Sequence, residues 1–245
     1  MITIIKAAVL LGIMVALSSA SAFDHSHAEL DGVLKNYVNA EGMVDYAGLK
    51  ANRSALDEYL VKTGVVSEAD FDSWTREQRL AFLINVYNAE TLKLIIDHYP
   101  VKSIKKIGGL FGQAWDVESV TLFGEKTTLN TIEHKILRPI YKEPRVHFAI
   151  VCAAMGCPPL RNGAFTPDKL DNQLDARGRL FLSQENKNRL DGGTLFLSPI
   201  FDWFGEDFTA NGSLQDFLTP FFPVDIKGKK LKIKFTDYDW SLNEQ

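Results

Sequence analysis

The sequence predicts an α+β fold, a single domain in which one buried helix packs on a small mixed or antiparallel sheet. Two observations support this prediction. The segment from Thr75 to His98 is apolar nearly all round, and a helix that is hydrophobic on every face is buried. In the rest of the chain, runs with helical spacing are followed by short strand-like runs that glycine turns separate. This order is typical of α+β domains rather than of repeating βαβ units.

The first residues have the pattern of a secretory signal peptide. Lys6 precedes an apolar run over residues 7–17, and the small residues at 18–22 end in an Ala-x-Ala cleavage signature. The apolar run is shorter than the roughly 20 residues that cross a bilayer. We therefore expect residues 1–22 to be removed, leaving residues 23–245 as one globular domain in the periplasm or outside the cell.

Local patterns predict the elements of the N-terminal half. Thr75 is the expected N-cap of the central helix, and Asn130 is expected to cap a later helix that ends near Pro139. The other elements expected here are helices over 30–38 and 49–60, a short strand or turn at 42–46, and a hairpin of residues 117–123 and 126–128 around Gly124.

The C-terminal half is predicted to be richer in β-structure. Residues 146–153 form an unbroken apolar run, which indicates an interior strand. Thr166 and Pro167 are expected to open another helix. The remaining expected elements are a strand over 195–197 after the 191–193 turn, an aromatic helix over 201–208 docked on the core, a short helix capped by Ser213, and a hairpin that pairs residues 224–227 with 230–235.

The overall charge is mildly acidic. The chain has 27 basic and 31 acidic residues, a net charge of −4, which becomes −5 if Lys6 leaves with the signal peptide. An acidic excess spread along the chain argues against nucleic acid or an anionic membrane as partner. We expect a small-molecule or peptide substrate, no nucleic acid, and no membrane-spanning segment in the mature chain.

Several segments together resemble a known family. They are AFLINVYNA at residues 81–89, LNTIEHKILR at 129–138 and RVHFAIVCAAMGCPPLR at 145–161, joined by shorter matches at 165–166, 203–208 and 238–243. From about residue 29 to the C-terminus, the chain resembles the domain of unknown function 547 family, found in bacterial secreted proteins and, in diverged form, in plants. The loop from Cys152 to Cys157, the cysteine loop, looks like the bacterial form of the family. The resemblance implies no assigned activity, although some plant members carry redox-type domains.

Reactive side chains gather in a few segments: His134, His147, Cys152 and Cys157, with Glu133 beside the first histidine. A cysteine attacks as the thiolate, which needs a nearby base or positive charge to lower its pKa from about 8.5. One hypothesis is therefore a thiol-dependent hydrolase or acyl transferase that acts on peptide, amide or thioester bonds. Cys157 would be the nucleophile and His134 the base, in a fold that is distantly papain-like or transglutaminase-like at best.

Further residues would complete such a site. His147 is a second candidate base, and Glu133 or Asn88 could orient the imidazole. Asn85 and Arg161 are candidates to bind substrate, Arg161 by stabilising an anion. Polar asparagines inside an apolar helix are costly unless their hydrogen bonds are satisfied, which is why they attract attention.

Other interpretations compete with thiol catalysis. A Cys152–Cys157 disulfide would close a short loop and contribute about 2 kcal/mol, as a local staple in a non-catalytic binding or accessory domain. The same pair could serve as a thiol–disulfide redox centre, but the spacing is not Cys-x-x-Cys, which favours the staple. Two histidines and two cysteines also match the ligand number of zinc, but their spacing matches no zinc signature. We expect no metal and no cofactor.

Several of these residues could instead have purely structural roles. Glu133 lies three residues after Asn130, the position of a capping-box acid. His147 in an apolar run is typical of a core histidine, and the two asparagines of the central helix could bond to backbone where chains cross. His25 and His27 lie beside the cleavage site and are expected to be disordered.

Overall fold

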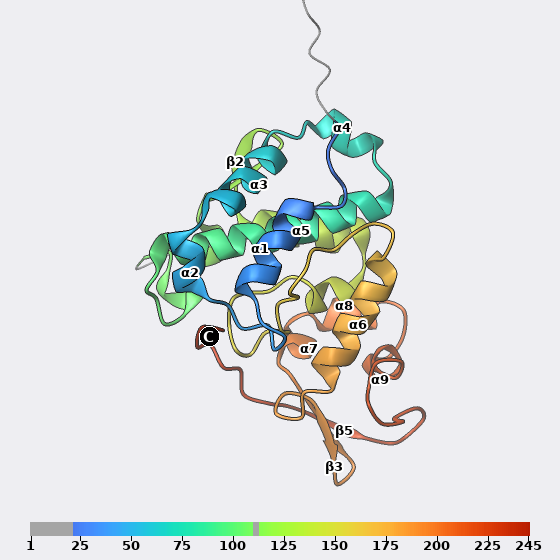
Figure 1. Ribbon diagram of the computed structural model, residues 1–245. Helices are drawn as coiled ribbons and strands as arrows, with labels where there is room; N and C mark the ends of the chain where they lie inside the picture. The colour runs from blue at the N-terminus through green and yellow to red at the C-terminus, as the bar shows by residue number, and fades with distance from the viewer. Residues whose placement is uncertain (1–21, 110–112) are drawn as a thin grey trace, which may run out of the picture.

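Helix α5 (Arg76–His98) crosses the middle of the molecule, and the other helices and the loops gather around it (Figure 1). This computed structural model describes residues 22–109 and 113–245. Thr75 caps α5 in a capping box with Gln78, as predicted. Nearly every residue from Leu80 to Ile96 is buried, so the prediction of a central buried helix is confirmed. The predicted signal peptide lies outside the described residues, except for Ala22.

Four short helices pack around one side of α5: α1 (Ala28–Tyr37), α2 (Tyr46–Ala51), α3 (Ser54–Gly64) and α4 (Glu68–Ser73). The predicted 49–60 helix is broken between α2 and α3, where Asn52 turns its side chain back to the carbonyl of Gly48. The expectation of a disordered start was wrong. His27 is buried and shares a 2.8 Å hydrogen bond with the Tyr59 hydroxyl, while Phe23 stacks on Trp74.

The next segment contains two 3-10 turns, η1 (Ile104–Lys106) and η2 (Ala114–Asp116), and the predicted hairpin of β1 (Val120–Leu122) and β2 (Glu125–Thr127). Helix η3 (Thr131–Tyr141) follows, and its turns are of the π type. Asn130 does not cap η3: its own backbone is helical, and the Thr128 hydroxyl accepts from the Thr131 N–H instead. Pro139 lies inside η3 because wide π turns absorb an interruption of the hydrogen-bond ladder.

The predicted strand over residues 146–153 is absent. Residues up to Phe148 form the 3-10 helix η4 (Pro144–Phe148), and an irregular segment follows. The apolar run is buried, but a side chain of α5 rather than a neighbouring strand satisfies its backbone. Asn88 donates to the carbonyl of Ala149 at 2.9 Å and accepts from the Val151 N–H at 2.9 Å. Because these groups are taken by a side chain, the run needs no sheet.

The C-terminal half surrounds a second hydrophobic cluster that contains Phe148. Its elements are α6 (Leu170–Leu182), α7 (Ile200–Trp203), α8 (Gly205–Thr209), α9 (Leu214–Leu218) and a sheet of β3 (Arg189–Asp191), β4 (Thr194–Leu197) and β5 (Lys232–Phe235) in the order β3-β4-β5. Ser213 caps α9, as predicted, and α6 begins at Leu170 rather than at Thr166.

The predicted final hairpin was wrong, because β5 pairs in parallel with β4 instead of with residues 224–227. The reason is Ile226, which is fully buried in the second cluster and whose carbonyl accepts from the Gln215 side chain of α9. The chain is therefore mixed helix and sheet in one domain, with two small sheets rather than a central one. In the described part of the chain, no helix is both long and apolar enough to cross a membrane.

We predict that Asn88→Ala lowers the free energy of unfolding by about 3 kcal/mol, because two buried backbone groups lose their partner. Chemical denaturation measures this loss. Asn172→Ala, at an exposed position of α6, is the matched control and should change stability little. Equal effects of the two substitutions would contradict the role assigned to Asn88.

Candidate functional site

A pocket of about 190 Å³ opens between η3, the cysteine loop, α7 and the C-terminal tail, which is the segment 236–245 after β5. Its floor and sides carry both aromatic and titratable side chains. The residues that line it are Tyr87, Gln113, Trp115, Asn130, Glu133, His134, His147, Ile150, Cys152, Cys157, Pro158, Ile200, Trp203, Phe204, Tyr238 and Trp240. A concave site with convergent polar groups is the natural candidate for binding or catalysis.

Cys152 and Cys157 form a disulfide, so the described part of the chain has no free cysteine. The disulfide interpretation of this pair is confirmed, whereas the nucleophile hypothesis needs a thiol that this oxidised state lacks. Both sulfurs line the pocket, although only 5% of the Cys157 residue is exposed and Cys152 is more open. The bond is therefore part of the pocket wall rather than a staple remote from it.

The C-terminal tail fixes the cysteine loop. The N–H groups of Met155 and Gly156 donate to carbonyls of Ser241 and Asp239, each at 2.8 Å. These bonds bring Tyr238 over the loop, and a Cβ on Gly156 would come within 2.7 Å of its ring, so only glycine permits this approach.

Two donors point at the disulfide. The Tyr238 hydroxyl lies 3.1 Å from Cys157 Sγ and 3.2 Å from Cys152 Sγ, and the Cys152 N–H donates to Cys157 Sγ at 3.0 Å. Burial, together with the nearby Glu133, raises the pKa of Tyr238, so the hydroxyl keeps its proton at neutral pH. Cys157 Sγ thus receives one N–H and one O–H contact, and both would stabilise a negative charge on this sulfur.

Glu133 is a buried carboxyl group in the same pocket. Its Oε2 accepts a 3.0 Å hydrogen bond from the Tyr87 hydroxyl, and only 7% of the residue is exposed. Burial raises the pKa of Glu133 to about 7, against the opposing effects of Tyr87 and Arg138. The predicted capping-box role is wrong because Asn130 is itself helical and Glu133 points to α5. A carboxyl that exchanges its proton near neutral pH suits general acid–base chemistry.

A charged network lies behind the pocket wall. Asp207 accepts from His147 Nε2 at 2.7 Å and from Arg138 Nε at 2.6 Å, both at Oδ2. Although burial opposes ionisation, these two bonds hold the pKa of Asp207 well below its usual range. Arg138 also donates to His134 Nδ1 at 2.8 Å, so that nitrogen carries no hydrogen. Burial and the nearby arginine lower the pKa of His134.

Aromatic side chains form another part of the pocket lining. The Trp203 ring stacks on Trp240 with 5.8 Å between centroids, and Tyr238 lies 4.8 Å from Trp203 and 4.5 Å from Trp240. Trp115 meets Trp240 edge to face at 6.0 Å. Because 47% of Trp203 is exposed, the aromatic segment over 201–208 does more than dock on the core, and its outer ring is open to a ligand.

The structure brings four of the predicted site residues together: Cys157, His134, His147 and Glu133 all line the pocket. Asn85 and Asn88 do not line it; Asn85 bonds both backbone groups of Phe165, as Asn88 bonds the segment after η4. Arg161 is also elsewhere, with its Nη1 donating to the Ala164 carbonyl. These three residues make structural hydrogen bonds away from the pocket, and the site roles of all seven residues stay predictions.

Sequence reasoning missed four participants: Tyr87, Tyr238, Arg138 and Asp207. Tyr87 could have been found from the sequence, because a tyrosine on a helix predicted to be buried needs a hydrogen-bond partner for its hydroxyl. Arg138 lies on η3, four residues after His134. Tyr238 and Asp207 come from distant segments, and only the fold brings them to the site.

We predict that Glu133→Gln flattens the pH dependence of stability. The folded state keeps the Glu133 proton up to about pH 7, whereas an unperturbed glutamate loses it near 4.5, so this group's contribution to stability falls as pH rises between these values. At pH 8 the variant should exceed the wild type by as much as about 3 kcal/mol in unfolding free energy. Glu125→Gln, on exposed strand β2, is the control, and equal pH curves for all three proteins would contradict the assignment.

Comparison with curated proteins and with solved structures gave no match. Residues 71–182 match the model of a family described as "Protein of unknown function, DUF547". The matched segment contains α5, η3 and the cysteine loop, and therefore Glu133, both pocket histidines and the disulfide, while Tyr238 lies outside it. Over residues 71–182 the chain therefore resembles the DUF547 family, as its sequence motifs indicated.

Proposed function

We propose that the protein is a thiol–disulfide exchange protein whose redox centre is the Cys152–Cys157 bond in the pocket wall. The observation that supports this function is the arrangement of donors: Cys157 Sγ receives both the Cys152 N–H and the Tyr238 hydroxyl, while Cys152 is the more open sulfur. A sulfur that leaves as a stabilised thiolate leaves faster. We further propose that the protein is exported, because disulfides persist in oxidising compartments.

The reaction begins when a substrate thiolate attacks Cys152 Sγ. The bond between Cys152 and Cys157 breaks, a mixed disulfide forms at Cys152, and Cys157 departs as a thiolate held by its two donors. A second thiol of the substrate then attacks the mixed disulfide, releases an oxidised substrate and leaves Cys152 as a thiol. Two electrons pass from a substrate dithiol to the protein. The pocket accepts the substrate, and its aromatic wall contacts apolar parts of it.

Glu133 is the proposed proton donor and acceptor for this exchange. Its pKa of about 7 lets it hold a proton at neutral pH, and its carboxylate opposes ionisation of Tyr238, so the two groups lie within electrostatic reach. The Tyr238 hydroxyl, which contacts both sulfurs, is the group through which we propose that this proton reaches the departing sulfur.

A second candidate is thiol-dependent acyl transfer or hydrolysis of a peptide, amide or thioester by the reduced protein. One observation favours it: Asp207 holds the imidazole of His147, which lines the same pocket as Cys157. In such an enzyme a carboxylate fixes the orientation of a histidine base beside the nucleophile. Reduction of the disulfide would then switch the activity on.

We predict that the disulfide equilibrates with glutathione buffers while the protein stays folded. Acid quenching, alkylation and mass spectrometry at each redox ratio give the reduction potential. Exchange proteins lie between about −120 and −270 mV, and we expect a value in that range. A potential below about −300 mV would identify a structural staple and contradict the proposal.

We predict that Tyr238→Phe slows reduction of the disulfide by dithiothreitol about three- to tenfold, because the Cys157 thiolate loses one of two donors. Thiol titration of the reduced variant should show a raised pKa for Cys157. Tyr37→Phe, outside the pocket, is the control. Hydrolysis of a thioester by the reduced wild type, lost in His147→Ala, would instead favour acyl transfer.

A further inference from the structure

The described chain begins at the end of the molecule where α4 lies, away from the β3-β4-β5 sheet (Figure 1). If the signal peptide is cut after Ala22, as its Ala-x-Ala pattern predicts, the mature chain begins with Phe23, Asp24 and His25. A free amino group at residue 23 is then followed by a histidine as the third residue. The inference drawn from this arrangement rests on the proposed export and on that cleavage position, but not on the redox function.

The side chains of Phe23 and His25 both contact the ring of Trp74. Phe23 stacks on the indole with 5.3 Å between centroids, and the His25 imidazole meets the indole edge to face at 4.5 Å. The Phe23 and His25 rings themselves lie 5.5 Å apart. Both ends of the tripeptide are therefore held beside one tryptophan, which keeps the first and third residues of the mature chain close together.

The nitrogen atoms of this tripeptide have no hydrogen-bond partners in the part of the chain that the structure describes. Nδ1 of His25 is shielded from solvent but makes no hydrogen bond there, and the N–H groups of Phe23, Asp24 and His25 donate none. The Asp24 carboxylate is directed elsewhere, since it accepts from the N–H and the hydroxyl of Ser26 at 2.9 and 2.8 Å. A shielded polar atom without a partner costs free energy, so a ligand that bound this nitrogen would recover that cost.

A terminal amine, the next two amide nitrogens and the imidazole of the third residue can surround one metal ion in a plane. Cu(II) and Ni(II) prefer such square-planar nitrogen sites, and Cu(II) binds a given site more tightly than Ni(II). The ion takes the place of the hydrogens on both amides, so binding releases protons. Among residues 22–109 and 113–245, no group of three or more His, Cys, Asp or Glu side chains could hold a metal ion, so this site depends on backbone nitrogens.

We propose that the mature N-terminus is a Cu(II) site formed by the amino group of Phe23, the backbone nitrogens of Asp24 and His25, and Nδ1 of His25. The site takes copper in its divalent state, because it lacks the soft sulfur ligands that select Cu(I). His27 is not a ligand, since it is only 2% exposed and its Nδ1 shares a hydrogen bond with the Tyr59 hydroxyl. The proposal departs from the expectation of no metal.

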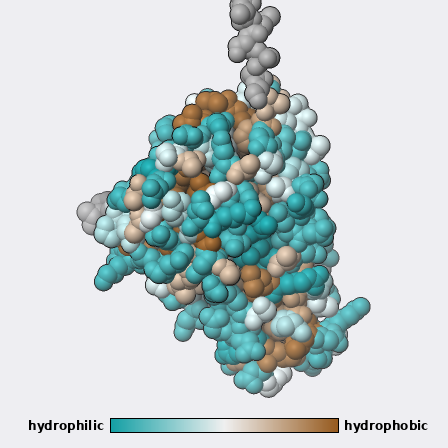
Figure 2. Space-filling view, viewed as in Figure 1, coloured by the Kyte–Doolittle hydropathy of each residue, from teal (hydrophilic) through white to brown (hydrophobic). Residues whose placement is uncertain are grey.

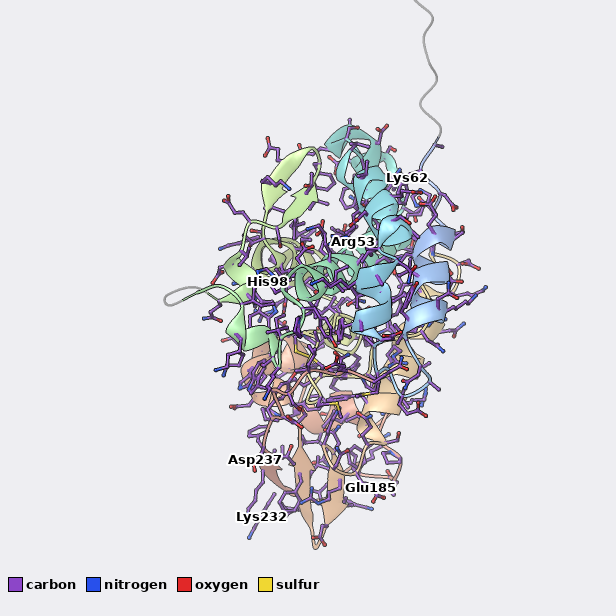
Figure 3. All side chains as sticks on the ribbon, turned by 60° about the vertical axis from the view of Figure 1, so that its left-hand side comes forward. Arg53, Lys62, His98, Glu185, Lys232 and Asp237 are labelled. Atoms are coloured by element: carbon purple, nitrogen blue, oxygen red, sulfur yellow. A yellow bond between two sulfur atoms is a disulfide. The ribbon has the colours of Figure 1, made fainter. Side chains whose placement is uncertain are left out.

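The tripeptide lies at the molecular surface. Asp24 is exposed, and Phe23 and His25 are half-buried. Figure 2 shows hydrophobic and hydrophilic side chains together at this upper end of the molecule. In Figure 3, Lys62 marks the same end, whereas the exposed His98 lies well away from it. A metal ion can therefore reach the backbone nitrogens from solvent, and the imidazole has only to turn on its own side chain to complete the site.

Two measurements test cleavage and copper binding separately. N-terminal sequencing of the protein exported by bacteria that express the full chain should begin at Phe23. Titration of that mature protein with Cu(II) should end at one ion per chain, with nitrogen hyperfine splitting in the electron paramagnetic resonance spectrum. Cu(II) should also quench tryptophan fluorescence, because the His25 ring contacts Trp74, and Trp74→Phe should remove most of this quenching.

The matched control is the same chain beginning at Ala22, which keeps every side chain of the mature protein but makes His25 the fourth residue. It should bind Cu(II) at least about a hundredfold more weakly, since donors linked in one chelate bind more tightly than separate donors. His25→Ala should show a similar loss, whereas His98→Asn should bind like the wild type. Thermal unfolding confirms that each variant is folded.

A first residue other than Phe23 in the exported protein would overturn both the cleavage position and the site. With that start established, equal affinity of the chains beginning at residues 22 and 23 would overturn the site alone. A loss in His98→Asn as large as that in His25→Ala would also overturn it. So would displacement of Cu(II) by an equal amount of Zn(II), which has no preference for planar sites.

Discussion

The structure depends on hydrogen bonds that the buried helix α5 sends into the chain segments crossing it. Asn85 holds both backbone groups of Phe165, and Asn88 holds the backbone on either side of Ile150. An irregular segment can be buried only if its polar backbone groups find partners. These two side chains provide them and so permit the cysteine loop to leave the core without a strand. The same helix supplies Tyr87, which binds the buried carboxyl group of the pocket.

Two carboxyl groups near the pocket have opposite properties. Burial keeps Glu133 protonated up to about pH 7, whereas His147 and Arg138 hold Asp207 ionised. The two carboxyl groups can therefore have different roles: Glu133 can exchange a proton, and Asp207 orients the His147 ring. The disulfide lies in the same pocket, beside the Tyr238 hydroxyl, whose pKa is raised by burial and by the nearby Glu133. This combination is why we propose a redox function rather than a local staple.

Sequence patterns predicted what local physics determines. The capping box at Thr75, the burial of α5, the β1–β2 and β3–β4 turns and the Ser213 cap all follow from short-range preferences. The apolar run over 146–153 was misassigned because its backbone partner is the side chain of Asn88, 63 residues before Val151, which hydrophobicity does not reveal. The parallel pairing of β5 with β4 depends likewise on the burial of Ile226.

The candidate site could be predicted only in part, again because contacts between distant segments decide which residues meet. Residue chemistry was sufficient to select the two cysteines, both pocket histidines and Glu133, since few other segments carry such groups. It could not separate pocket residues from structural ones, so Asn85, Asn88 and Arg161 were grouped with them. Tyr238 and Asp207 reach the pocket through tertiary contacts of the C-terminal tail and α8, which no spacing in the sequence encodes.

The central claim is that an external thiol reaches the disulfide through the pocket of the folded protein. The most direct measurement is the rate of reduction by dithiothreitol at increasing, sub-denaturing concentrations of urea. If the pocket gives access, the rate should stay nearly constant until the unfolding transition begins. A rate that rises exponentially from the lowest urea concentration, with the slope of global unfolding, would show that the bond reacts only after unfolding and would contradict the claim.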